Sequence, residues 1–379
     1  MKTTPEGIYA INSSEFNAIE LPIIHEVRGK DYMSYGGKNL FPQKLIELYD
    51  TSAMHHTCVD SITAGIIGAG IEIIGTEYIN PDGETIDEIF EKISLDYTLY
   101  QGFAINVIWN KEQTKIAEMY HLPFANVRSG KPDEEDKVNE YMFSSDWTNL
   151  RKYPYDTYRA FDATDNKGDN ASQVYYCYGY TPGNEVYPLP GYVAALNDIS
   201  LDAQVSRFHS NNIANGLAPS MFISMRNGVP TPEERRDVYR EIEKTFTGTE
   251  NAGRFFLSFS EPGKEMSVTP IKSENDDYYL TLETRISSRI LTAHRITSPL
   301  LLGLHDGQAG FSSNSEEIKV AYAHFEGTVI TPKRKKILSN FGYMLKLMGY
   351  NIGLKVAPNQ LVPDAEVADT EPQSNIESL

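Results

Sequence analysis

The sequence has few cysteines and no long apolar run, and these two shortages exclude several classes of protein. Among 379 residues there are only two cysteines, Cys58 and Cys177, too few for a disulfide framework or a thiolate metal cage. We therefore expect both to be ordinary buried thiols. The most apolar stretch, 58–75, contains Asp60, Glu72 and four glycines, so it does not predict a membrane-spanning helix. The N-terminal MKTTPEGIYA has no apolar signal core, so no export signal is expected.

Positive charge is also scarce. The sequence has 34 lysines and arginines against 52 aspartates and glutamates, which gives a formal net charge of -18. This balance argues against a conventional duplex binder, because affinity for DNA comes mainly from cations that displace phosphate counterions. An acidic wall could still surround DNA and let it pass without gripping it. The simpler alternative is that the surplus carboxylates keep the protein soluble. With 40% apolar and 23% charged residues, we expect a globular chain of two or three domains.

Familiar catalytic motifs are missing as well. The sequence contains no G-x-x-x-x-G-K-[ST] phosphate loop, G-x-S-x-G elbow, H-E-x-x-H pair or G-x-G-x-x-G turn, so no ATP-driven motor, catalytic residue, metal ion or cofactor is predicted. His55-His56-x-Cys58 favours an incidental helix face over zinc ligation. Asp133–Asp136 favours a solvated acidic run over the carboxylates of a metal-dependent nuclease. Lys333–Lys336 favours a solvated face, with pairing to helix ends or contact with phosphate as alternatives.

Helical and strand patterns alternate along the chain and predict an α+β fold. Apolar spacing predicts a helix over 54–66, and Thr85-x-x-Glu88 is a capping box that opens another. Alternating residues in 103–109, a turn, and 115–121 predict a hairpin, and a tyrosine-rich strand is expected at 174–180. The polar region 129–170 predicts loops and short edge strands.

Two long helices are expected on either side of a small α/β unit. The stretch 192–212 has helical length, but its apolar residues are diluted by polar ones on the other faces. A helix with so little apolar surface usually needs lateral neighbours. The second helix begins near Asn275-Asp276 and stops at Ser298-Pro299. Between them, strands at 221–225 and 254–260 and a helix at 231–247 are predicted.

The C-terminal third predicts a loop, a kinked helix and a tail. The loop, 305–314, contains Gly307 and Gly310 and precedes a helix capped by Ser313-x-x-Glu316. Gly327 and Thr331-Pro332 should kink that helix. The acidic tail, 357–379, has the composition of a disordered segment.

Several segments resemble, in the same order, the portal (head-to-tail connector) proteins of tailed double-stranded DNA bacteriophages. The similarity spans about residues 50–350. Its parts are GFAINVIWNKEQTKIAEMYHLP from Gly102, FHSNNIANGLAPSMFISM from Phe208, GTENAGRFFLSF from Gly248, ITSPLLLGL from Ile296 and SSNSEEIKVAYAHF from Ser312. The sequence departs from the family pattern at Ser298-Pro299, where Pro-Pro is expected, and its C-terminal region is short.

The resemblance implies a portal-type subunit assembled as a closed ring of about twelve copies. Its parts would be a wing (1–191), stem helix 1 (192–214), a clip (215–272), stem helix 2 (273–297), a channel loop (298–315), a kinked channel helix with the remaining wing or a short crown (316–356) and the tail (357–379). The ring would sit at the capsid vertex of the virion, after assembly in the host cytoplasm. It would pass double-stranded DNA during packaging and ejection.

The resemblance also implies partners and site residues. The partners would be the terminase packaging motor, the major capsid protein and a head-tail adaptor, with no membrane. The DNA channel loop would present His305, Asp306, Gln308, Phe311, Ser312, Ser313 and Asn314. The channel helix would present Glu316, Glu317 and Lys319, and the clip would offer Arg235, Arg236, Arg240 and Glu243 to partners. The alternatives are another ring-forming head-tail adaptor and a metal-dependent nuclease.

Overall fold

The computed structural model of the chain describes residues 19–71, 78–164, 171–214, 221–225, 255–259, 276–304, 315–350 and 356. The chain divides into two compact units, each built from separate stretches. Unit 1 comprises 1–59, 146–153 and 180–325, and unit 2 comprises 60–145, 154–179 and 326–379. The segment 1–191, predicted as one wing, therefore contributes to both units.

Unit 2 is built around a six-stranded sheet in the order β4-β3-β8-β7-β6-β5. Its strands are β3 (Gly102–Trp109), β4 (Ile116–Leu122), β5 (Val127–Ser129), β6 (Glu140–Phe143), β7 (Asp156–Ala160) and β8 (Ser172–Tyr178). Neighbouring strands are antiparallel except β7 and β8, which are parallel. The predicted hairpin is confirmed as β3 and β4, and the tyrosine-rich strand is β8. The polar region gives β6 and β7. Both strands lie inside the sheet, so the prediction that they are edge strands was wrong.

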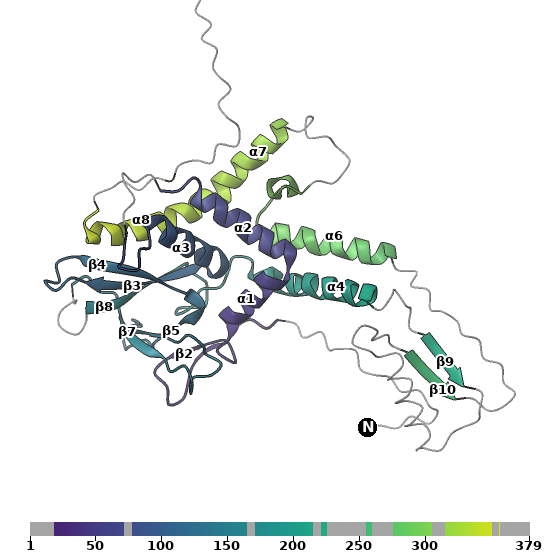
Figure 1. The fold of residues 1–379 in the computed structure, drawn as a ribbon, viewed down its shortest axis with the longest axis horizontal. Helices are drawn as coiled ribbons and strands as arrows, with labels where there is room; N and C mark the ends of the chain where they lie inside the picture. The colour runs from purple at the N-terminus through teal and green to yellow at the C-terminus, as the bar shows by residue number, and fades with distance from the viewer. Residues whose placement is uncertain are drawn as a thin grey trace, which may run out of the picture. The chain divides into compact units, whose positions relative to one another are not determined.

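Two helices of unit 2 cover one face of this sheet, α3 (Ile86–Tyr100) and α8 (Thr331–Met348) (Figure 1). The rings of Phe90 and Phe341, one from each helix, are fully buried with centroids 6.4 Å apart. The predicted capping box of α3 is confirmed: Thr85 Oγ1 accepts from the Glu88 amide at 3.2 Å, and Glu88 Oε2 accepts from the Thr85 amide at 2.7 Å. The local sequence thus fixes where α3 begins, and its apolar face then holds it on the sheet.

The predicted irregularity near Gly327 and Pro332 is a π-helical turn. Helix α7 (Ser315–Phe325) is followed by η5 (Glu326–Ile330), and α8 begins at Thr331 with Pro332 in its first turn. Proline lacks the amide hydrogen that a continuous α-helix would use at this point, and glycine tolerates the altered winding.

Unit 1 contains the two long helices predicted from the sequence. They are α4 (Leu196–Ala214), which follows the 3-10 turn η3 (Val193–Ala195), and α6 (Asp276–Ala293). The unit also holds the hairpin β1 (Ile24–Glu26) and β2 (Met33–Tyr35), helix α1 (Phe41–Thr51), the turn η4 (Pro299–Leu302), and the parallel pair β9 (Met221–Met225) and β10 (Phe255–Phe259). Helix α2 (Ala53–Ile67) contributes residues to both units.

Other sequence predictions have clear outcomes. Cys58 and Cys177 are buried free thiols, and burial raises the pKa of Cys58 to about 12 and that of Cys177 to about 11. No helix in the described part of the chain combines the length and hydrophobicity of a membrane span. The predicted clip helix, the loop 305–314 and the tail 357–379 lie outside the described residues.

Candidate stem helices and their surroundings

Helices α4 and α6 run side by side as an antiparallel pair, called here the helix pair (Figure 1). Two polar contacts cross between them. Arg289 Nη1 lies 3.1 Å from Asp198 Oδ1, and His209 Nε2 lies 3.1 Å from Glu283 Oε1. These contacts are exposed, so each contributes at most about 1 kcal/mol. Their main value is that they fix the register of one helix along the other.

Apolar packing is concentrated at one end of the helix pair. Leu196, Ile199, Ile286 and Ile290 are buried there. Farther along, the described side chains are mostly exposed; they include Gln204, Ser206, Arg207, Phe208 and Ser210 of α4 and Thr281, Glu283, Thr284 and Arg285 of α6. The prediction that the first of these helices carries little apolar surface is therefore confirmed for α4. Polar helix faces of this kind can be exposed to water in a single subunit and can also pack against another subunit.

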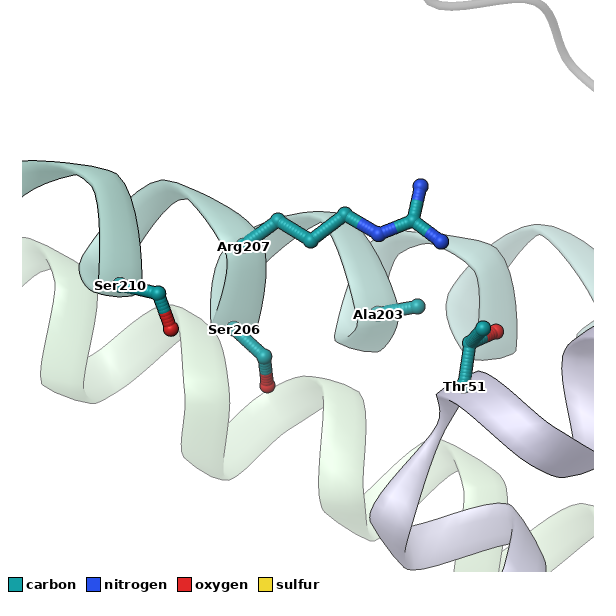
Figure 2. Close-up of a pocket in the computed structure, with 5 residues that line it drawn as sticks. All are labelled: Thr51, Ala203, Ser206, Arg207 and Ser210. Carbon is teal, nitrogen blue, oxygen red and sulfur yellow. The ribbon is translucent and has the colours of Figure 1, made fainter. Parts of the chain in front are cut away.

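A shallow open groove of about 330 Å³ runs along α4. Figure 2 shows its lining: Thr51, at the end of α1, together with Ala203, Ser206, Arg207 and Ser210 of α4. Ala203, Ser206 and Ser210 are three and four residues apart, so they share one helix face. The lining holds hydroxyls and one guanidinium but no general base, so this groove is suited to packing and not to catalysis.

No protein family model and no curated protein matches the sequence. Solved structures do match the fold. A chain of "Virion of native gene transfer agent (GTA) particle" aligns with a TM-score of 0.53 and 17% identity, over 85% of this chain and 86% of that one. A chain of "Neck of native GTA particle computed with C12 symmetry" aligns with a TM-score of 0.52 and 18% identity, over the same shares of the two chains.

The chain has the fold of these particle subunits. The fold class predicted from the sequence is therefore confirmed. A phage portal protein of the HK97 family from Corynebacterium diphtheriae aligns less closely, with a TM-score of 0.45 and 9% identity, over 77% of this chain and 87% of that one.

Within this fold, the predicted site residues are only partly described. Glu316 and Glu317 belong to α7, but their side chains lie outside the described set, and Lys319 is exposed on the same helix. The predicted channel-loop residues and the predicted clip residues lie outside the described residues. Sequence reasoning did not single out the groove on α4. The small residues Ala203, Ser206 and Ser210 at helical spacing could have indicated it, but larger polar residues lie between them in the sequence.

The acidic run 133–136 is held in a turn that uses its first carboxylate. Asp133 Oδ1 accepts from the amides of Glu135 at 2.9 Å and Lys137 at 3.0 Å, and Asp133 Oδ2 accepts from Asn139 Nδ2 at 2.6 Å. The hydrogen bond from the Lys137 amide, followed by that from Asn139, lowers the Asp133 pKa. The side chains of the described residues form no cluster of three or more His, Cys, Asp or Glu that could hold a metal ion. The nuclease alternative is not favoured.

The basic cluster 333–336 contributes one cation to a helix end. Arg334 Nε donates to the Ile66 carbonyl at 3.0 Å, its Nη2 donates to the Gly65 carbonyl, and its Nη1 lies 2.7 Å from Glu326 Oε1. The carbonyls belong to the last turn of α2, where intrahelical partners run out. Of the alternatives predicted for this cluster, pairing with a helix end is confirmed for Arg334.

Proposed function

We propose that this protein is the portal protein of a tailed bacteriophage, a structural subunit without enzymatic activity. Twelve copies form a ring at the capsid vertex of the virion, through which double-stranded DNA is packaged and later ejected. One observation carries the proposal: the fold aligns along 85% of the chain with a subunit of a particle neck computed with C12 symmetry. In this role the ring also docks the terminase motor, the major capsid protein and a head-tail adaptor, and it assembles in the host cytoplasm.

The helix pair supports ring formation through its register. The contacts Asp198–Arg289 and His209–Glu283 imply that Ser206 lies level with about Thr284. By the same register, Ser210 lies level with about Thr281 and Ala203 with about Ser288. Thr281, Thr284 and Ser288 are exposed on α6 and, at this spacing, share one helix face.

In a ring, we propose, that face of α6 enters the groove on α4 of the adjacent subunit. If the ring axis runs along the helices, the rotation that relates adjacent subunits does not shift them along that axis. Residues at the same level of α4 and α6 can then meet across the interface, and repeating this heterologous contact closes a ring. Small side chains on both faces allow helix axes to approach to about 8 Å. The stems would then form a continuous wall.

The remaining assignments are proposals from the same resemblance. The wing, clip, channel loop and channel helix keep the ranges given above. The loop residues between His305 and Asn314, with Glu316, Glu317 and Lys319 after them, face DNA. Arg235, Arg236, Arg240 and Glu243 form a charged clip rim that meets the motor and the adaptor, where charges tune docking rate and partner choice.

The test pairs electron microscopy with cysteine cross-linking. We expect twelvefold rings in axial views of the purified protein. We also expect the double variant Ser206→Cys/Thr284→Cys to give, on mild oxidation, a ladder of covalent oligomers, because facing Cα atoms come within disulfide range. Native Cys58 and Cys177 are buried and add little background.

The matched control is Gln204→Cys/Thr284→Cys, in which the first cysteine is exposed but points about 160° away from Ser206 around α4. It should not give a ladder. Rings without a ladder for the first variant would reject the stem interface alone. A protein that stays monomeric at high concentration would reject the portal assignment itself.

A further inference from the structure

Three aromatic rings are packed together at the apolar end of the helix pair, and the portal function does not account for them. His55 of α2 and His294, the residue after α6, are joined by a hydrogen bond of 2.9 Å between Nδ1 and Nε2. Tyr192, just before η3, lies against both, with ring centroids 4.6 Å from His55 and 4.9 Å from His294. The exposed fractions are 0% for His55, 5% for His294 and 3% for Tyr192.

The hydrogen bond between the two imidazoles uses a single ring hydrogen, and the ring that accepts it is neutral. One nitrogen must carry the hydrogen and the other must be bare. Among the described residues, the second ring nitrogen of His55, Nε2, is buried and has no hydrogen-bond partner. The assignment that avoids an unsatisfied buried N–H places the hydrogen on His55 Nδ1, which donates to His294 Nε2.

Among the residues that the structure describes, no carboxylate is paired with His55. On α2, His56 stacks on Tyr49 of α1, and Cys58 is a buried neutral thiol. Ser52, before α2, accepts from the His55 amide at 3.3 Å and donates to Asp202 of α4 at 2.7 Å. Arg295, after His294, is exposed and cationic. Burial, with a smaller effect of His56, lowers the His55 pKa to about 3, and burial raises the Tyr192 pKa, so that phenol stays neutral.

We propose that the His55–His294 pair, packed against Tyr192, is an acid-sensitive lock that fastens the ends of α4 and α6 to α2. One more proton on the pair would create a buried cation and an N–H at His55 Nε2 for which the described residues offer no acceptor. Protonation therefore requires the contact to open, which releases the end of α6 and the turn before α4 together.

The direction of the pH effect follows from linkage. An exposed histidine takes up its proton near pH 6.5, whereas His55 in the closed lock does so only near pH 3. The closed form therefore has its full stability above pH 6.5 and loses it as the pH falls from 6.5 towards 3. For each histidine of this kind, the open population rises up to about tenfold per pH unit.

Hydrogen–deuterium exchange on the full-length protein tests the lock. After correction for intrinsic exchange rates, protection of the amides in 286–293 should fall by up to about tenfold per unit between pH 6 and pH 4. His55→Phe keeps a ring in the site but removes its titration, so most of this slope should disappear. His25→Gln, at an exposed histidine of the same unit, should leave the slope unchanged.

Equal protection at pH 7 and pH 4.5, or a slope retained in His55→Phe, would overturn the proposal. Exchange of the imidazole C2 hydrogens, followed by mass spectrometry, needs no variant and reports the pKa of each histidine in the unmodified protein. The pKa measured for His55 should lie far below 6.5, the ordinary value for histidine. An ordinary pKa near 6.5 for His55 would reject the lock even if every variant failed to fold.

Discussion

Arg334 illustrates how much one side chain can join. Its side chain is 18% exposed. The guanidinium contacts Glu326 of η5 and two carbonyls in the last turn of α2. These contacts hold three segments of unit 2 with the planar fork that only arginine offers. A lysine at this position would satisfy fewer of the acceptors.

We expect Arg334→Met to lower the free energy of unfolding by about 1–3 kcal/mol, because it removes a donor from two partly buried carbonyls and the cation that pairs with Glu326. Lys335→Met is the matched control, since Lys335 is exposed on the same helix, and it should change stability by less than about 0.5 kcal/mol. Urea unfolding followed by circular dichroism gives both values. Equal losses would show that the contacts of Arg334 contribute nothing specific.

At the scale of elements, sequence patterns predicted the features that depend only on neighbouring residues. The capping box at Thr85 and the alternation in 103–109 depend on residues a few positions apart, and both predictions are confirmed. The place of β6 and β7 inside the sheet was missed, because strand pairing depends on partners distant in sequence. The histidine pair is separated by 239 positions, so no local pattern could have revealed it.

The π-helical turn η5 packs closely against α2 in unit 2. A Cβ added to Gly65 would lie 2.8 Å from Ile330 Cδ1, and Ile330 is fully buried. Gly65→Ala should therefore destabilise the protein by about 1–3 kcal/mol through overpacking, despite the better helix propensity of alanine.

Ile330→Val removes the clashing Cδ1 atom and alone should cost about 0.5–1.5 kcal/mol. The double variant should be more stable than the sum of the two losses predicts, and a double-mutant cycle in urea measures this coupling. Strict additivity would contradict the close packing of Gly65 on η5.

At the scale of the whole molecule, the charge of -18 has a meaning in the proposed ring. Twelve acidic subunits around a duplex would repel it on every side, so DNA could move without strong binding. Whether these carboxylates line the channel could not be predicted from composition, because net charge carries no positions.

Adding cations at the proposed channel loop should reverse this effect. On the proposed function, Gln308→Lys/Ser312→Lys should slow DNA packaging in a reconstituted motor assay, most strongly at low salt, where phosphate contacts are strongest. Gln308→Ala/Ser312→Ala is the neutral control and should package at the normal rate. If the lysine variant packaged normally at low salt, the loop would not face DNA.

The division of unit 2 into separate stretches has a consequence for synthesis on the ribosome. The sheet residues of β3 to β8 are made long before α8, yet α8 closes their helical layer: Tyr175 Oη donates to Asn340 Oδ1 at 2.5 Å, and Phe341 is fully buried. About 150 residues separate β8 from α8, so at typical elongation rates the nascent unit stays open for roughly ten seconds or more. A chain released early would lack a finished unit 2, and only complete chains would be fit to join a ring.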